Sequence, residues 1–414
     1  MKALVLAGGF AQIELIKQLK ARGVIVVLAD GSPNALAKPY ADIFHQVPLF
    51  DVEAVKQVAL AEKVDFLITC CADQVLLIVA QVSEMLGLPC YISYKTAQEV
   101  SDKKYMKRIF WEHDIPTSRY FELAELEWDK IHQLRYPVVV KPTDAYSSRG
   151  VRKASDDNTL QTYFEEAKQI SRTNSVIVEE FCEGEEISVD VYVEGGKAHI
   201  LCVSNSEKIK DDDRFVIFRG RYPVSATQDV MEQIRKVAQQ SADAFHIENA
   251  PMLIQMINSG SSVSVLEFCA RTGGNMKYLL IQRACGFGVI KAVIDLTLGL
   301  KPHVELCPPE SKYIVNDFIY CYPGVFDHLE GFDELIAKGI LSDYRILRPK
   351  GFKALGASSS SDRVAGFTVQ ANTLEEFNRK HQVVVETVKV VDTNGNDIMR
   401  HDLLPDLLPL AMEK

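Results

Sequence analysis

The sequence has no stretch that approaches the roughly 20 consecutive apolar residues needed to cross a bilayer. After Lys2, only the short apolar run 3–7 precedes Gly8, which is too short for a secretory signal. Nine cysteines are present without CxxC spacing, and Cys70 and Cys71 are adjacent. This pattern is typical of reduced, buried thiols and disfavours a zinc site. We therefore expect a cytoplasmic protein with no membrane partner.

Basic residues are also fewer than acidic ones. The 414 residues include 46 Lys and Arg against 56 Asp and Glu, a formal net charge of −10. A nucleic-acid-binding protein would usually show a basic face, so that class is disfavoured, although a local basic pocket is not. Hydrophobic residues at 47% suffice for an ordinary globular core, and the length predicts two to four domains.

Residues 1–100 alternate short apolar runs with helical periodicity. This βα repeat predicts an α/β fold with a doubly wound parallel sheet. Strands are expected at Ala3–Ala7, Val24–Ala29 and Phe66–Cys70, and helices at Val52–Glu62 and Val75–Leu86.

The rest of the chain reads as α+β in parts. Ser101 is a candidate helix cap, and one apolar helix is expected over Tyr278–Leu298. Thr373 and Glu376 fit a capping box before a helix to Lys380. Strands are expected at 138–141 (closed by Pro142), 175–181, 187–193, 198–203, 252–257, 263–268, 313–320, 352–355, 364–369 and 387–391.

Two nucleotide-binding motifs are missing. Gly8-Gly9 follows a strand and opens a helix, where backbone NH groups can hold an anion, and Asp30 stands where a ribose ligand would. GxGxxG spacing is absent, so a dinucleotide-dependent oxidoreductase is disfavoured against a tight strand-to-helix turn. No GxxxxGK[ST] P-loop occurs either.

Three segments of the middle region carry chemistry. Lys141 ends an apolar strand and precedes Ser147-Ser148-Arg149-Gly150, whose small residues could approach a polyphosphate. An acid-rich turn, Glu179–Glu186, follows a second strand, where a carboxylate could accept ribose hydroxyls; a solvated charged turn is the alternative.

The third segment contains Glu267, which interrupts an apolar strand. A buried carboxylate must be paired or metal-bound. Cross-strand pairing can bring Gln255 to the same face, and such oxygen ligands suit Mg²⁺ on nucleotide phosphates. Arg271 could neutralise a transferring phosphoryl group. A structural Glu267–Arg271 ion pair is the alternative.

In order along the chain, these segments resemble the ATP-grasp superfamily. The resemblance implies a pre-ATP-grasp domain over 1–100, an ATP-grasp domain over 101–300 with a small lid lobe at about 115–182, and a C-terminal lobe over 301–414 completing the large domain. It implies ATP bound with Mg²⁺, or Mn²⁺ in its place, and permits a homodimer.

The resemblance also implies roles for individual residues. Lys103 and Lys141 would contact phosphates under the flexible loop Ser147–Gly150. Glu179, Phe181 and Cys182 would lie beside adenine. Glu186 would hold the ribose, and Gln255 and Glu267 the metal. Arg271 would face the transferring phosphate and Asn275 the substrate.

Two positions depart from the family pattern. Cys269 stands where many members have a metal-binding Asn, and thiol is a poor ligand for Mg²⁺. Gln255 replaces Asp or Glu, as in the carbamoyl-phosphate synthetase branch. The segment Phe352–Gly366 resembles the biotin carboxylase and L-amino-acid ligase branches, and no biotin-carrier lysine motif occurs.

The resemblance therefore implies a stand-alone carboxylate–amine ligase that forms an acyl phosphate and then an amide or peptide bond. Another ATP-grasp outcome, such as a carboxylase or kinase, and a non-catalytic ATP-binding protein remain alternatives. The substrates are left open, with amino acids the best guess for the amine. Candidate substrate contacts, with surface positions as the alternative, are Lys208, Arg219, Arg221, Arg271 and Arg363.

Overall fold

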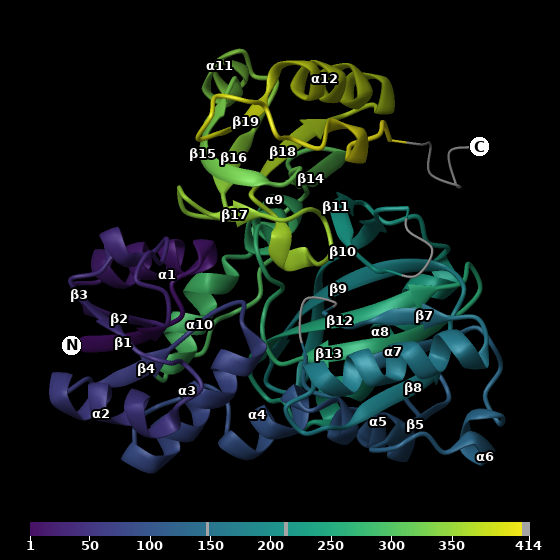
Figure 1. Ribbon diagram of the computed structural model, residues 1–414. Helices are drawn as coiled ribbons and strands as arrows, with labels where there is room; N and C mark the ends of the chain where they lie inside the picture. The colour runs from purple at the N-terminus through teal and green to yellow at the C-terminus, as the bar shows by residue number, and fades with distance from the viewer. Residues whose placement is uncertain (146–148, 211–213, 408–414) are drawn as a thin grey trace.

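The computed structural model describes residues 1–145, 149–210 and 214–407. Figure 1 shows an N-terminal unit in purple and blue beside a larger teal and green body, with a yellow-green lobe above them. None of the helices in these described ranges has the length and apolar character that crossing a bilayer requires.

The N-terminal sheet is fully parallel, in the order β3-β2-β1-β4. Its elements are β1 (Lys2–Leu6), α1 (Phe10–Ala21), β2 (Ile25–Asp30), β3 (Ile43–Gln46), α2 (Val52–Glu62), β4 (Phe66–Ile68) and α3 (Asp73–Leu86). Apolar residues of α1 pack on one face of the sheet and those of α2 and α3 on the other. The predicted doubly wound arrangement is thus confirmed.

Two short helices lead into a four-stranded antiparallel sheet of order β5-β8-β6-β7. The helices are α4 (Tyr94–Ser101) and α5 (Lys103–Glu112). The sheet and its covering helices comprise β5 (Tyr120–Leu123), α6 (Trp128–Ile131), β6 (Val138–Pro142), β7 (Arg152–Ala154), α7 (Asp157–Ile170) and β8 (Val176–Glu180).

The largest sheet has eight strands in the order β13-β12-β9-β10-β11-β14-β18-β16. Its first part contains β9 (Glu185–Glu194), β10 (Lys197–Lys208), β11 (Ile217–Tyr222), α8 (Gln228–Ala244), β12 (Ala250–Asn258) and β13 (Val263–Cys269). After α9 (Lys277–Cys285) and α10 (Val289–Thr297), β14 (Tyr313–Ile319), β16 (Asp343–Ile346) and β18 (Ala365–Ala371) extend the same sheet. The C-terminal region therefore continues the sheet that the middle region begins.

A small three-stranded sheet of order β17-β15-β19 lies in the upper lobe (Figure 1). The strands of this sheet are β15 (Gly324–Glu330), β17 (Lys353–Ala354) and β19 (Lys389–Asp392), and the lobe also contains the helices α11 (Phe332–Ala337) and α12 (Leu374–Thr387). The domain boundaries near residues 100 and 300 remain predictions.

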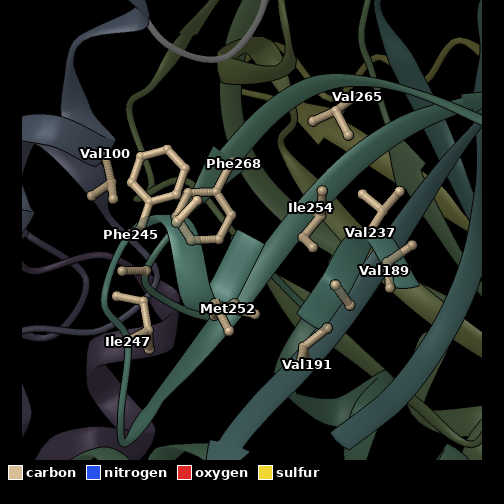
Figure 2. Packing of buried hydrophobic residues seen from close by; sticks show 14 of the residues in the cluster. Val100, Val189, Val191, Val237, Phe245, Ile247, Met252, Ile254, Val265 and Phe268 are labelled. Atoms are coloured by element: carbon tan, nitrogen blue, oxygen red, sulfur yellow. The ribbon is translucent and has the colours of Figure 1, made fainter. Parts of the chain in front are cut away.

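The core under β9 and β12 is held by aromatic and branched side chains (Figure 2). Phe245 and Phe268 stack with ring centroids 4.5 Å apart, and Phe110 meets Phe245 edge-on at 5.9 Å. Ile254 and Val189 oppose each other across the two strands. Because interiors are close-packed, this core fixes where the polar opposite face of the strands projects.

Three local predictions were wrong. Asp102, not Ser101, caps α5, because its carboxylate accepts from the Lys104 NH. The helix expected over Tyr278–Leu298 is two helices, since Gly286 takes φ +76° and ends α9. Thr373 caps α12 as predicted, but Glu376 accepts from the Asn372 NH rather than completing the box.

A glycine in the β8–β9 connection can be tested directly. Gly184 has φ +140°, and an added Cβ would lie 2.3 Å from the Asn258 oxygen. We expect Gly184→Ala to destabilise the fold by more than about 2 kcal/mol, because the clash is with backbone. Gly195→Ala is the matched control, with φ +57° and no neighbour within 4 Å, and should cost about 1 kcal/mol. Equal losses in urea unfolding would show that the close approach is unimportant.

Candidate active site

A cavity of about 760 Å³ lies where the three large sheets and the C-terminal lobe converge. The residues predicted from the sequence that line it are Lys103, Lys141, Glu179, Phe181, Cys182, Glu186, Lys208, Gln255, Glu267, Arg271, Asn275 and Arg363. Gly150 does not line it, and Ser147 and Ser148 fall outside the described residues. Segments far apart in sequence thus bring most of the predicted site residues to one place.

Glu179 lies at the bottom of this cavity between two lysines. Its Oε1 accepts from Lys141 Nζ at 2.5 Å and its Oε2 from Lys107 Nζ at 2.6 Å. Burial opposes ionisation of Glu179, but the two lysines outweigh it and lower the pKa of this carboxyl to about 2. Burial also lowers the pKa of Lys107 to about 8, although Glu179 opposes that shift. Two cations sharing one carboxylate leave this cluster with a net positive charge.

Lys103 and Glu267 form the second ion pair, with Nζ and Oε1 2.8 Å apart. Lys103 also donates to the Ala145 oxygen at 3.0 Å. Glu267 stands directly opposite Gln255 in the β12–β13 register, as the alternation predicted. The alternative Glu267–Arg271 ion pair was wrong, because Glu267 pairs with Lys103.

Arg271 instead reaches the N-terminal domain. Its Nε donates to Asp73 Oδ1 at 2.6 Å, and its Nη2 bonds Oδ2 of the same carboxylate. Burial disfavours the charged form of Asp73, yet Arg271 outweighs it and keeps the pKa of this carboxyl below its ordinary value. Asp73 opens α3, at the edge of the parallel sheet where ligands of such sheets bind.

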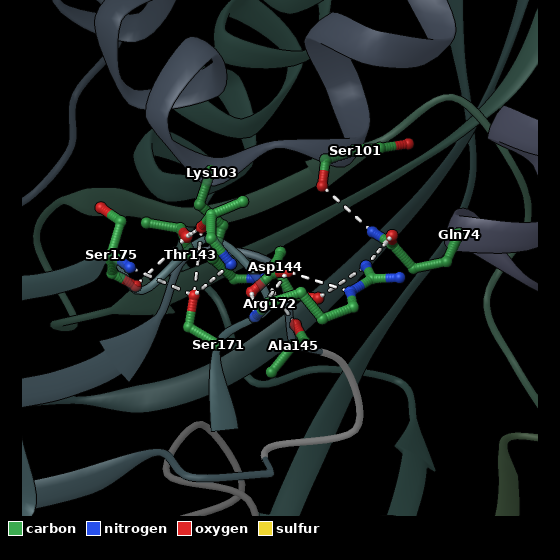
Figure 3. Close-up of polar contacts among 10 residues, drawn as sticks. Gln74, Ser101, Lys103, Thr143, Asp144, Ala145, Ser171, Arg172 and Ser175 are labelled. Carbon is green, nitrogen blue, oxygen red and sulfur yellow. Dashed lines mark hydrogen bonds and ion pairs between the residues drawn. The ribbon is translucent and has the colours of Figure 1, made fainter. Parts of the chain in front are cut away.

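The loop after β6 is fastened to the same edge (Figure 3). Arg172 Nε donates to Asp144 Oδ2 at 3.0 Å, and its Nη2 donates to Gln74 Oε1 at 2.7 Å. Thr143 bonds the Ser175 oxygen through both NH and hydroxyl. The segment that follows Lys141 is therefore held between α3 and the four-stranded sheet.

Glu186 occupies the side of the cavity nearest β10. It pairs with Lys208 and accepts from Gln255 Nε2 at 3.1 Å. Beside it, Phe181 stacks on Phe215 with centroids 6.3 Å apart. Apolar residues from both sheets complete a slot here, namely Val139, Val151, Ile217, Leu253, Ile257 and Leu266. A flat apolar ring fits such a slot, with polar groups at its rim.

A divalent cation has two suitable donors in the cavity. Gln255 and Glu267 present oxygen atoms from paired strands, which suits Mg²⁺ carried on nucleotide phosphates, since such sites need only one or two protein ligands. Cys269 is 2% exposed, and burial raises the pKa of its thiol well above the ordinary value, so it offers no thiolate. No group of three or more His, Cys, Asp or Glu ligands occurs in the described ranges.

Other candidates from the sequence lie elsewhere. Arg219 is fully buried and pairs with Asp317 at 2.6 Å, and Arg221 pairs with Glu207, so neither lines the cavity. Asp30 accepts from the Gly8 NH at 2.6 Å, which satisfies the Gly8-Gly9 turn from within the protein. This contact supports the structural interpretation of that turn.

Sequence reasoning missed Asp73, Lys107 and Phe215. Each lies outside the recognised motifs, and only contacts with residues distant in the chain reveal its place. Helical periodicity puts Lys107 four residues after Lys103, one turn along α5, which was the one signal that could have identified it.

Comparison with known proteins agrees with this geometry. Residues 134–278 match the family model described as an ATP-grasp domain. This part of the chain is therefore an ATP-grasp domain. The matched range runs from before β6 to the start of α9 and contains Lys141, Glu179, Gln255, Glu267 and Arg271.

Among solved structures, this ATP-grasp protein is similar to the L-amino acid ligase from Bacillus licheniformis. The TM-score is 0.78 at 20% identity, over 95% of this chain and 99% of that one, which establishes the fold. Among curated proteins, it is 24% identical to the carbamoyl phosphate synthase large chain of Clostridium acetobutylicum, over 65% of this chain and 26% of that protein.

It is also 27% identical to a D-alanine–D-alanine ligase of Cupriavidus pinatubonensis, over 54% of this chain and 73% of that ligase. The chain spans about a quarter of the synthase's length and about half the length of several other curated relatives. Similarity therefore shows an ATP-grasp domain and the fold, while the reaction needs a separate argument.

Proposed function

We propose that this protein is an ATP-dependent carboxylate–amine ligase that releases ADP and phosphate. The observation that carries the proposal is that Lys103, Lys141 and the paired Gln255 and Glu267 line one cavity together with a set of apolar side chains. A ring-binding slot next to cations and oxygen donors matches the parts of a nucleoside triphosphate with its metal.

In this proposal the adenine lies in the slot beside Phe181 and Cys182, and Glu186 accepts the ribose hydroxyls. The cluster of Lys141, Lys107 and Glu179 supplies net positive charge for the phosphates. Lys103 is paired with Glu267, and it would be free to contact the phosphates once that carboxylate held Mg²⁺. Gln255 and Glu267 would hold Mg²⁺, which neutralises phosphate charge when bound.

The reaction balances in two steps. An oxygen of the substrate carboxylate attacks the γ-phosphorus, the bond to the β-phosphate oxygen breaks, and ADP leaves. The amine nitrogen then attacks the acyl carbon, phosphate leaves with that carboxylate oxygen, and the amine loses a proton. Arg271 and Lys141 stabilise the charge on the transferring group, because fixed cations act strongly in a site with little water.

The names of relatives favour amino compounds as substrates. They include D-alanine–D-alanine ligase, phosphoribosylamine–glycine ligase and L-amino acid ligase. Another structural neighbour, from Hydrogenobacter thermophilus, is a biotin carboxylase domain dimer. We therefore propose that this protein can also form a homodimer. We propose amino acids as the first acceptors to try.

The test is a panel of carboxylates and amines, incubated with ATP and Mg²⁺ and monitored for nucleotide products. ADP and phosphate should form in equal amounts, and only when both a carboxylate and an amine are present. AMP and pyrophosphate would contradict the acyl-phosphate route. Turnover with bicarbonate alone would indicate a carboxylase, and tight ATP binding without turnover would favour a binding protein.

A further inference from the structure

Arg363 is an exception among the buried cations of this protein. Three arginines of the described residues are buried, and two of them, Arg219 and Arg221, each pair with a carboxylate. Arg363 is 7% exposed, yet no carboxylate of the described residues forms an ion pair with it. Burying a guanidinium without an anion is unfavourable, and arginine remains protonated in proteins, so it cannot become neutral instead.

The contacts of Arg363 are all neutral. Its Nε donates to the Tyr320 hydroxyl at 3.1 Å, and its Nη2 to the Ile217 oxygen at 2.8 Å and to Ser360 Oγ at 3.1 Å. The guanidinium carbon lies 3.9 Å from the centroid of the Phe318 ring. These contacts hold the group rigidly, and its Nη1 bonds no atom of the described residues.

The neighbouring acid is committed elsewhere. Asp362 accepts from the NH groups of Ser358 and Ser359, each at 2.9 Å, and so caps its own short helix. Arg363, Phe318 and Ser360 all line the 760 Å³ cavity. An oxyanion entering that cavity is therefore the partner that the buried charge lacks.

The position of Arg363 separates it from the reacting end. Phe318 lies on β14, four strands from β12, where Gln255 stands. At about 4.8 Å per strand, the two ends of the cavity floor lie on the order of 19 Å apart along the sheet. Arg363 is thus placed to bind a group distal to the bond being formed.

We propose that Arg363 binds an oxyanion, carboxylate or phosphate, at the far end of an extended substrate that reaches across the cavity. This inference rests on the proposed ligase function. A planar guanidinium stacked on an aromatic ring, with donors left over, suits carboxylate or phosphate. Neutral acceptors of the same shape would leave the buried charge unpaired.

The experiment compares peptides of about two to six residues, their C-terminal amides and long-chain aminoalkyl phosphate monoesters as acceptors in the phosphate-release assay, since each extended residue spans roughly 3.3 Å. The enzymes are wild type, Arg363→Gln, Arg363→Lys and Arg400→Gln. Arg400 is the matched control, since it pairs with Asp402 in the same lobe, stacks on Tyr322 and lies outside the cavity.

With wild type and Arg400→Gln, an anionic acceptor should have a KM about 10- to 100-fold below that of its neutral counterpart. Arg363→Gln should lose this preference while the KM for ATP stays within about twofold, and Arg363→Lys should recover part of it. Whichever acceptor has the lower KM, the carboxylate or the phosphate, identifies the group that Arg363 binds.

A preference for the anionic acceptor that survives in Arg363→Gln would overturn the proposal. To separate this from failure of the ligase function, each peptide is also titrated against the MgADP-saturated protein and the unfolding midpoint recorded. Stabilisation of wild type and Arg400→Gln, but not Arg363→Gln, supports the site even without turnover. Equal stabilisation of all three, or of none, contradicts it.

Discussion

Glu267→Gln is expected to lower the rate of ADP formation by about 10²- to 10³-fold or more. The substitution keeps the size of the side chain and removes the negative charge that faces Lys103 and stands opposite Gln255. It therefore removes the proposed carboxylate ligand for the metal at the phosphates. The rate is measured by phosphate release at saturating ATP.

The same variant should fold normally. The Glu267 side chain is 31% exposed, and a glutamine oxygen can still accept from Lys103, so the free energy of unfolding should change by about 1 kcal/mol or less. Glu62→Gln is the matched control, because Glu62 pairs with Lys2 and His45 outside the cavity. If Glu62→Gln slowed the reaction as much as Glu267→Gln, the metal site would be misplaced.

Glu179→Gln should produce the largest loss of stability. Its amide would face Lys107 and Lys141, which are 1% and 7% exposed, without the charge that compensates them. Removing one member of a buried ion pair typically costs about 3–5 kcal/mol. Unfolding in guanidinium chloride at neutral pH is the measurement, and catalysis should fall with stability because Lys141 loses its position.

The pH dependence of this loss has a definite sign. The pKa of Glu179 in the folded protein is about 2, below its ordinary value of 4.5. Its contribution to stability is therefore fully present above pH 4.5 and is lost as pH falls toward 2. At high pH the defect in Glu179→Gln should shrink, because the pKa of Lys107 is lowered to about 8 and the neutral lysine no longer needs a partner.

Two variants make this prediction specific. Glu180→Gln is the control, since Glu180 pairs with Arg135 at the surface and should cost no more than about 1 kcal/mol. Adding Lys107→Met to Glu179→Gln should restore part of the stability, because one buried cation is then removed. A double variant as unstable as the sum of both changes would contradict the shared-carboxylate interpretation.

Local chemistry made much of the architecture predictable. The α2 bounds Val52–Glu62 match the sequence prediction. Alternation along β12 and β13 placed Gln255 and Glu267 on one face, and the observed register pairs them. Periodicity and turn residues act within a few positions, so they report on such features directly.

What the sequence did not reveal depends on contacts across the fold. The sequence left open an ion pair between Arg271 and Glu267, four residues away. The structure instead pairs Arg271 with Asp73, 198 positions distant. Lys107 joins Glu179 only because α5 packs beside the four-stranded sheet. Arg363 stood out only once every possible counterion could be located. Pairing of charges is set by tertiary packing, which no short window of sequence contains.

If a substrate carboxylate takes the γ-phosphate of ATP in this cavity, one of its oxygens must leave with the phosphate. The decisive measurement uses a substrate that carries ¹⁸O in both oxygens of its carboxylate, followed by mass analysis of the released phosphate. We expect one ¹⁸O atom in each phosphate and none in the nucleotide. Unlabelled phosphate, or label in AMP, would contradict this expectation.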